Sequence, residues 1–197
     1  MLTETIVLSN AVALLGHAPI TSLTGNDKLV LAAQQAYQML LPSVLSKNDW
    51  RFAVNIAPLV QSAVIPPSPW KIVYNLPSGY LKLIRLYPNI YEWEIYNNSQ
   101  LYSIINGNLQ IEYVFQPEVS QLPGYFVNYF VYEIAYYLAL SNAQKPEYAA
   151  ALASERDKQF SMAAAIDAQN RPNFSQVLFP VLVNRSIGGF IGNGGDG

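Results

Sequence analysis

Two pairs of acidic residues come closest to the spacing of a catalytic or metal-binding site. Glu92 and Glu94 are two residues apart, so a strand would present both carboxylates on one face, where they could hold a hard cation. On an exposed strand, however, such carboxylates are far more often simply solvated. Glu155 and Asp157 fall in a helical pattern, in which residues two apart point in different directions. Neither pair therefore predicts a site.

The other residues with chemical potential are isolated from one another. His17 is the only histidine, and no carboxylate lies three or four residues away from it on either side. The chain has no cysteine, which excludes disulfides, thiolate nucleophiles and cysteine-ligated zinc. It contains no G-x-S-x-G elbow, and the glycines of 188–197 do not lead into a helix as a phosphate-binding loop does. We predict no catalytic residues, no metal ligands, no cofactor and no enzymatic activity.

The amino-acid composition favours a protein that works in an assembly. Apolar residues make up 51% of the 197 residues and charged residues only 12%, against about 25% charged in a typical soluble domain. Tyrosine is the commonest aromatic, with 14 copies. Two explanations stay open from composition alone: a large core, or a surface that other chains cover, since apolar and Tyr-rich surfaces mark interfaces.

The charge distribution argues against a protein that grips nucleic acid. The net charge is −2, and the eleven basic residues are scattered without a run, whereas phosphate binding needs clustered Lys and Arg. A channel through which DNA passes without being held remains compatible with this pattern.

One stretch, residues 122–141, has the length and apolarity of a membrane-spanning helix. Glu133 lies near its centre, where a charge is costly in a bilayer, and five tyrosines interrupt it. We interpret it as a buried or interface helix and predict no membrane association. Glu4 also occupies the place where a signal peptide would carry basic residues, so we expect no signal peptide.

Helical spacing of apolar residues recurs at both ends of the chain. It predicts helices over residues 3–15, 27–48, 123–142 and 146–169. Pro42 falls inside the second and predicts a kink or break, because proline lacks the N–H and clashes with the preceding turn. The third helix is apolar all round, which indicates burial on all sides, and the short break after it predicts antiparallel packing with the fourth. Residues 155–158 are interpreted as a charged, solvated patch of the fourth helix.

Between these helices the apolar period changes to two. Asn106-Gly107 is the strongest hairpin signal, because a type I′ turn needs positive φ at both central positions, and Asn97-Asn98 is a weaker one. The prolines of 64–70 indicate a loop or a sheet edge. We predict that residues 50–116 form one small antiparallel sheet of about four to six strands.

Helices on both sides of a block of strands predict an α+β fold. The expected architecture is an antiparallel four-helix bundle with an inserted small antiparallel β-sheet over residues 1–172, followed by an extended C-terminal arm over 173–197. The arm has many apolar residues without a clear period and ends in glycines. We interpret it as a segment that docks on a neighbouring chain. The alternative is a strand that wraps back onto its own domain.

Several short motifs, in order, resemble the head-to-tail adaptor family of short-tailed phages (podoviruses), also called tail tubular protein A. Residues 11–27, AVALLGHAPITSLTGND, are similar to the family's opening, in which an apolar helix ends in Leu-x-Gly and a Pro and a Ser-Leu pair lead into an Ala-rich helix. Residues 48–53, NDWRFA, resemble its Trp-x-Phe box, and residues 77–81, PSGYL, its Pro-x-x-Tyr-Leu element. The resemblance covers about residues 3–172 and does not extend to the arm.

The resemblance implies a non-enzymatic virion protein, assembled in the host cytoplasm, that forms a ring of twelve copies between the portal and the tail nozzle. Double-stranded DNA would pass non-specifically through the lumen of that ring. The family's C-terminal region reaches the portal. On this basis we predict that the portal-binding anchors are Phe174, Leu178, Phe179, Leu182 and Phe190.

Two other functions stay open. The chain could be a different neck or tail protein, such as a head-completion subunit or a tail assembly chaperone, which ring size would distinguish. It could also be a glycan-cleaving tail enzyme that uses Glu92 and Glu94, which an activity screen with a Glu92→Gln variant would test.

Overall fold

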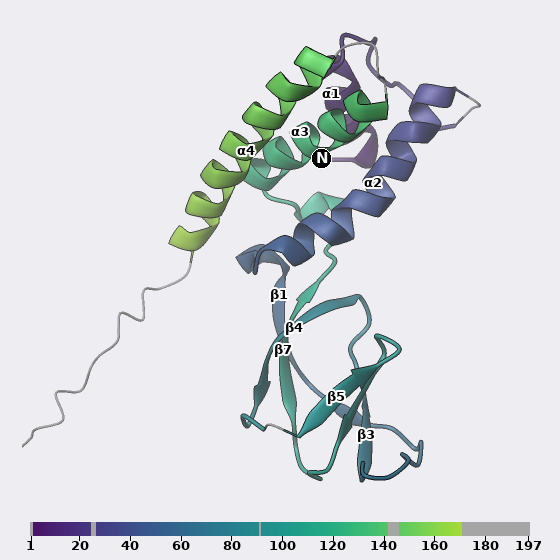
Figure 1. Ribbon diagram of the computed structural model, residues 1–197, viewed down its shortest axis with the longest axis vertical. Helices are drawn as coiled ribbons and strands as arrows, with labels where there is room; N and C mark the ends of the chain where they lie inside the picture. Colours follow the sequence, from purple (N-terminus) through teal and green to yellow (C-terminus); the bar gives the residue numbers. More distant parts are fainter. Residues whose placement is uncertain (1, 25–26, 91, 142–145, 171–197) are drawn as a thin grey trace, which may run out of the picture.

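A computed structural model describes residues 2–24, 27–90, 92–141 and 146–170. The described helices gather at one end of the molecule and the strands at the other (Figure 1). The helices are α1 (Glu4–Leu14), α2 (Lys28–Lys47), α3 (Gly124–Ser141) and α4 (Pro146–Gln169), with short 3-10 turns η1 (Arg51–Ala53) and η2 (Val119–Gln121). The strands are β1 (Val54–Pro58), β2 (Val60–Gln61), β3 (Ile72–Asn75), β4 (Tyr80–Tyr87), β5 (Trp93–Tyr96), β6 (Gln100–Ser103) and β7 (Gln110–Phe115).

Both ends of α1 are defined by interactions between residues close together in the sequence. The Thr3 hydroxyl caps the first turn by accepting a hydrogen bond from the Ile6 N–H, at 3.3 Å. At the other end Gly16 adopts φ +79°, the left-handed conformation that glycine tolerates best. This turn directs the His17 N–H to the Val12 carbonyl, at 3.1 Å, and so closes the helix.

Of the kink or break predicted at Pro42, the break does not occur. α2 continues through Pro42 to Lys47, and the Ser46 hydroxyl donates a hydrogen bond to the Pro42 carbonyl at 2.8 Å. Leu41 and Val44, on either side of the proline, are buried in the core. Their packing holds the helix together across the position where proline removes a backbone hydrogen bond.

α3 lies at the centre of the helical part, and α1, α2 and α4 each pack against it. Its buried residues lie on several sides of the helix, in keeping with an all-round apolar sequence. They are Phe126, Val127, Tyr129, Phe130, Val131, Glu133, Ile134, Ala135, Leu138 and Ala139. α4 pairs antiparallel with α3, since Tyr125 contacts Asp167 and Glu133 contacts Arg156.

The predicted architecture, α+β with a four-helix bundle and one small inserted sheet, is contradicted. The described chain is a mixed fold with helices towards both ends and two antiparallel sheets between them, ordered β1-β7-β4 and β2-β3-β6-β5. The helices surround α3 rather than forming a bundle. The strands form two sheets because Ile72, Tyr74 and Leu101 of one and Leu86 and Ile111 of the other are all buried in one shared core, and a single sheet would leave those faces without a covering layer.

The hairpin prediction at Asn106-Gly107 is wrong, while the one at Asn97-Asn98 is confirmed. Asn97 and Asn98 have φ 53° and 49°, and their turn joins β5 to β6. Gly107 instead lies in the connection that carries the chain from β6 in one sheet to β7 in the other. Its carbonyl accepts a hydrogen bond from the Tyr74 hydroxyl at 2.8 Å, and its N–H donates back to that oxygen at 3.1 Å.

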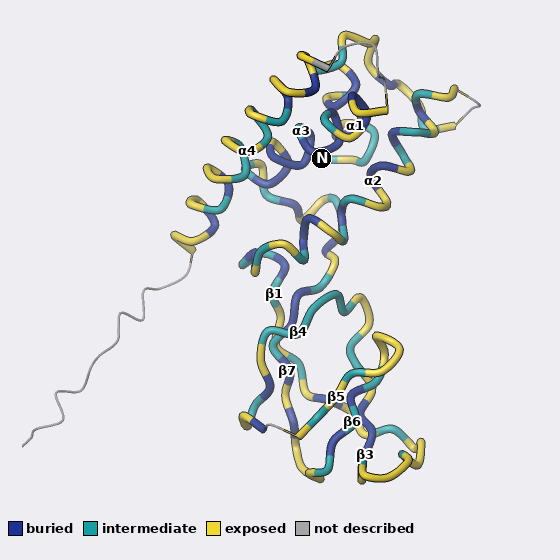
Figure 2. The backbone as a smooth tube through the Cα atoms, in the orientation of Figure 1, coloured by how far each residue is buried: buried dark blue, intermediate teal, exposed yellow. Residues whose placement is uncertain are grey.

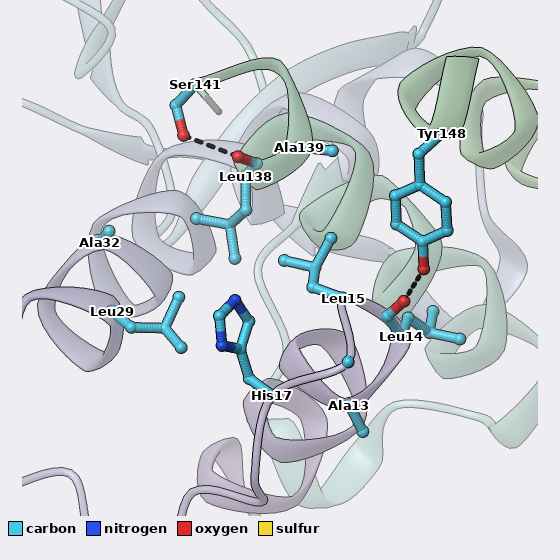
Figure 3. Close-up of a pocket in the computed structure, with 11 residues that line it drawn as sticks. Ala13, Leu14, Leu15, His17, Leu29, Ala32, Leu138, Ala139, Ser141 and Tyr148 are labelled. Atoms are coloured by element: carbon cyan, nitrogen blue, oxygen red, sulfur yellow. Dashed lines mark hydrogen bonds between the residues drawn. The ribbon is translucent and has the colours of Figure 1, made fainter. Parts of the chain in front are cut away.

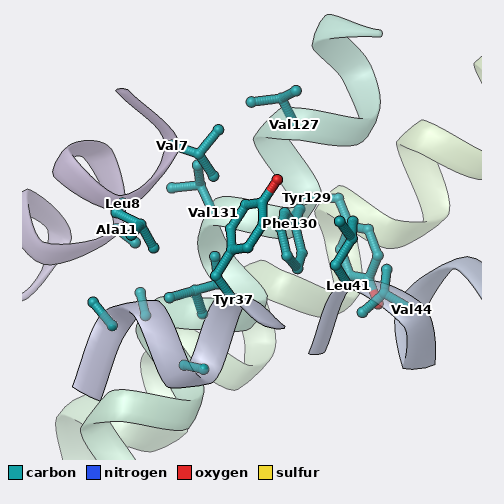
Figure 4. Packing of buried hydrophobic residues seen from close by; sticks show 14 of the residues in the cluster. Val7, Leu8, Ala11, Tyr37, Leu41, Val44, Val127, Tyr129, Phe130 and Val131 are labelled. Carbon is teal, nitrogen blue, oxygen red and sulfur yellow. The ribbon is translucent and has the colours of Figure 1, made fainter. Parts of the chain in front are cut away.

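Two hydrophobic cores result, one among the helices and one between the sheets. In the helical core the Tyr37 ring meets Phe130 edge to face, with centroids 5.3 Å apart (Figure 4). Burial, and to a lesser extent the charge of Glu4, raises the pKa of Tyr37 to about 12. Dark, buried backbone follows α3 and the inner faces of its neighbours, while α4 exposes its outer face (Figure 2).

Trp50 joins the helical part to the strands. It stands between α2 and η1, is fully buried, and donates its indole N–H to the Val44 carbonyl at 3.1 Å. Its ring packs edge to face on Phe126 of α3 and Phe160 of α4, at 5.2 and 6.0 Å between centroids. One side chain thus packs against α3 and α4 and is hydrogen-bonded to α2, at the point where the chain enters β1.

Replacing Trp50 tests this junction. Trp50→Ala should lower the free energy of unfolding by about 3 to 5 kcal/mol, the cost of a large aromatic cavity in a core. Denaturant unfolding followed by circular dichroism measures it. Trp70→Ala, in the half-exposed loop before β3, is the matched control and should cost much less. Equal losses at the two positions would contradict the role given to Trp50.

Candidate interaction surfaces

The acidic residues singled out in the sequence do not converge. Glu94 is exposed on β5 and accepts a hydrogen bond from the Tyr96 hydroxyl at 2.6 Å, which raises the pKa of Tyr96. Glu92 is also exposed, one residue before that strand. Within the described part of the chain, no group of three or more His, Asp and Glu side chains is placed to hold a metal ion.

Glu133 is the centre of a buried ionic cluster that links three helices. Its carboxylate lies 3.1 Å from Lys47 Nζ of α2 and 3.7 Å from Arg156 Nε of α4, and it accepts a hydrogen bond from the Tyr129 hydroxyl at 3.3 Å. Burial, together with the charge of Glu133, raises the pKa of Tyr129. The Arg156 guanidinium also stacks over the Tyr136 ring, 4.4 Å from its centroid. These contacts explain a charge in the middle of an apolar helix.

The interpretation of residues 155–158 as one solvated patch is therefore wrong for Arg156, whose side chain is 22% exposed. Arg156 lies 3.7 Å from buried Glu133 and also donates hydrogen bonds to the exposed Asp157 at 2.7 and 2.9 Å, while Lys158 pairs with Glu155 on the surface at 3.2 Å. Adjacent charges in the sequence could not show this difference, because it depends on the rotation of α4 against α3.

Asp167 is a second buried acid that sequence reasoning missed. It is 3% exposed, and its two oxygens accept hydrogen bonds from the Arg51 N–H and the Tyr125 hydroxyl, each at 2.8 Å. Burial, followed by the hydrogen bond to Asp167, raises the pKa of Tyr125. These bonds fasten the end of α4 to η1 and to the start of α3. No local pattern distinguishes this aspartate from a solvated one.

The basic side chains are largely engaged by acids of the same chain. Of the eight Lys and Arg residues that the structure describes, five form ion pairs, so few are left to meet phosphates. At the junction with the strands, Lys82 lies 2.7 Å from Asp49 and Arg51 lies 4.0 Å from Glu112. This arrangement does not provide a basic surface for nucleic acid.

An uncharged groove runs between α2 and α3, here called the α2–α3 groove. Its first cavity, about 540 Å³, opens where α1 ends, and a second, about 630 Å³, continues along the helices. Ala32, Leu138 and Ser141 line both cavities. His17, Leu29 and Leu138 face into the first one (Figure 3). None of the described lining residues is Asp, Glu, Lys or Arg.

A second apolar surface, here called the β-edge surface, covers β1, β2 and the loop after them. Glu112 of β7, which pairs with Arg51, lies directly across from Ile56. Its exposed apolar side chains are Ile56, Val60, Val64 and Ile65, which is 92% exposed. No charged residue occurs between Arg51 and Lys71. Both β1 and β2 are outermost strands of their sheets, and edges of this kind are usually protected by charge.

The backbone of that edge is already partly closed. The Leu59 N–H donates a hydrogen bond to the Leu109 carbonyl at 2.8 Å, so it points into the sheet. Because backbone N–H groups alternate in direction along a strand, the Ile56 N–H, three residues earlier, points to the open edge. The Ile56 N–H is taken by the side chain of Asn55 at 2.8 Å, and Pro58 has no N–H. A partner would therefore meet apolar side chains here rather than a free strand edge.

The predicted portal anchors Phe174, Leu178, Phe179, Leu182 and Phe190, like the whole arm, lie outside the described residues. Their role stays a prediction.

Among the described residues, no helix combines the length and the hydropathy needed to cross a membrane. No protein-family model matches the chain, and no curated protein matches it.

The buried cluster predicts unequal effects for two neighbouring basic residues. Arg156→Ala should lower the free energy of unfolding by about 2 kcal/mol, because it removes a charged partner from buried Glu133. Lys158→Ala, on the same helix, should cost at most about 0.5 kcal/mol because its ion pair is exposed. Urea denaturation of both variants measures the difference, and similar values would contradict the assignment.

Proposed function

We propose that the chain is a non-enzymatic virion subunit, the adaptor ring that joins the portal to the tail nozzle of a short-tailed phage and surrounds the DNA channel. The observation that carries the proposal is the pair of apolar surfaces exposed on one chain, the α2–α3 groove and the β-edge surface. The adaptor family is proposed because the order of the sequence motifs resembles that of this family.

Two different surfaces suit a ring. A subunit of a closed ring meets its two neighbours through different patches, and rotation closes the assembly. The groove is hollow and lies among the helices, whereas the β-edge surface carries projecting side chains, with Val60 66% and Ile65 92% exposed. Isolated exposed apolar residues are common, but a continuous uncharged stretch with several of them is typical of an interface.

The distribution of charge suits a wall past which DNA moves. A lumen that bound phosphates tightly would retain the DNA, and the affinity would depend steeply on salt. In the described part of the chain the basic residues at the junction, Lys47, Arg51 and Lys82, are each paired with an acid. Such pairs leave little net positive charge to hold DNA.

Ring formation is tested with the full chain and the portal protein of the same phage. We expect the mixture to give a complex with twelve copies of this chain beneath the portal, counted by electron microscopy and by native mass spectrometry. A chain that stays monomeric with the portal and with the nozzle protein would overturn the proposal. A ring of another size without portal affinity would favour a different neck protein.

The β-edge surface should be needed for assembly and not for folding. Ile65→Asp should leave the circular dichroism spectrum and the unfolding midpoint unchanged, because the side chain is almost fully exposed, while it reduces complex formation in native mass spectrometry. Ser99→Asp adds the same charge to the exposed turn between β5 and β6 and is the control. Unimpaired assembly of Ile65→Asp would remove this surface from the interface.

The paired charges predict weak binding to DNA. Fluorescence anisotropy with a labelled duplex at physiological salt should show a dissociation constant no tighter than about 10⁻⁴ M, the weak end of non-specific binding. Micromolar binding that weakens steeply with added salt would contradict a channel wall that does not hold DNA.

A further inference from the structure

The α2–α3 groove has the chemistry of a site for an uncharged apolar peptide segment. Ala32, Leu138 and Ser141 line both of its cavities, and the Ser141 hydroxyl donates a hydrogen bond to the Leu138 carbonyl at 2.6 Å. The first cavity adds the polar groups of His17 and Tyr148, and none of the described lining residues is Asp, Glu, Lys or Arg. Gln35 and Gln38 offer amide groups along one wall of the second cavity. Amides of this kind can pair with the backbone of a bound peptide without introducing a charge.

The groove also interrupts the burial of α3. The sequence predicted that α3 would be covered on all sides, yet Tyr137 of α3 and Met39 of α2, which both line the second cavity, remain exposed. Within the described chain, one side of α3 therefore stays partly uncovered along the groove. A further apolar segment would complete the covering of α3.

The chain itself contains a segment with matching chemistry. Residues 172–184, PNFSQVLFPVLVN, carry no charge, and basic residues flank them at Arg171 and Arg185. Seven of these thirteen residues are large and apolar, namely Phe174, Val177, Leu178, Phe179, Val181, Leu182 and Val183. An uncharged groove loses least on desolvation when its occupant also carries no charge.

The position of α4 favours a second copy as the source of this segment. Tyr148, at the start of α4, lines the first cavity, whereas the described chain ends at Asn170, at the other end of the helix. The two positions are about 33 Å apart at 1.5 Å per helical residue. An extended chain needs about ten residues to return that distance, which would use most of residues 172–184 before they reached the first cavity.

We propose that the α2–α3 groove of one copy binds residues 172–184 of a second copy. The contact joins the far end of α4 on one subunit to the α1 end of the groove on the next. Because the two surfaces differ, successive copies can continue it around a ring, whereas a product that stops at the dimer in the test below would show a reciprocal two-fold exchange instead. This proposal depends on the proposed function only in that several copies of the chain must assemble. It also assigns four of the predicted portal anchors, Phe174 to Leu182, to a neighbouring subunit instead of the portal.

Because the chain has no cysteine, only the introduced thiols can form disulfides in a cross-linking test. A full-length double variant with Ala32→Cys in the groove and Val181→Cys in the segment is oxidised without portal present, and its products are separated on a non-reducing gel. Ala32 lines both cavities. Two further double variants carry Val177→Cys or Leu178→Cys in place of Val181→Cys. A disulfide requires Cα atoms closer than about 7 Å, so the three variants sample different registers of the segment in the groove.

The expected result is the loss of the monomer band into a ladder of disulfide-linked oligomers for at least one of these pairs. Mass spectrometry should identify the peptide joining position 32 to the segment. The control pair, Ser99→Cys with Val181→Cys, places the first thiol on the exposed turn of the strands and should give no ladder. Excess synthetic peptide of residues 172–184 should suppress the ladder, and a scrambled peptide should not.

Two results would overturn the proposal. A monomer with an internal disulfide would show that the segment folds back onto its own groove. Thiols that are accessible to a labelling reagent but form no specific cross-link at any register would show that the groove takes something else. A ring seen by electron microscopy without the cross-link would leave the proposed function standing and remove only this contact.

Discussion

The structure depends on the burial of α3, a helix with almost no polar face. A helix of this kind needs apolar neighbours on every side, and α1, α2 and α4 cover most of it. Trp50 then extends the same core to the start of the strands through Phe126 and Phe160. The β part packs around its own core between two sheets and is attached to the helices at this junction.

Burying α3 also determines where the charges lie. Glu133 is buried in the helical core and pairs with Lys47 and Arg156 at its edge, and buried Asp167 accepts hydrogen bonds from the Arg51 N–H and the Tyr125 hydroxyl. A chain with only 12% charged residues therefore holds several of them in internal contacts. Large parts of its surface are left uncharged, and this is the physical basis of both proposals, the ring and the exchange of the C-terminal segment.

The elements that local interactions specify were predictable, and those that need distant partners were not. The Thr3 cap and the Gly16 stop depend on residues within one or two turns, and they bound α1 where the helical pattern predicted a helix, over residues 3–15. The Asn106-Gly107 hairpin failed because Tyr74, distant in sequence, binds both polar groups of Gly107. A turn preference worth a fraction of a kcal/mol does not outweigh such tertiary contacts.

The amino-acid sequence by itself determined that the chain has helices towards both ends and strands between them, and that it is poor in charge and lacks thiols. These properties follow from composition and from periodicity within a few turns. Only the tertiary structure decided that the strands form two sheets, that Arg156 contacts buried Glu133 while Lys158 faces solvent, and that a groove remains beside α3. Those outcomes depend on how elements distant in sequence rotate and pack against one another, which no local pattern encodes.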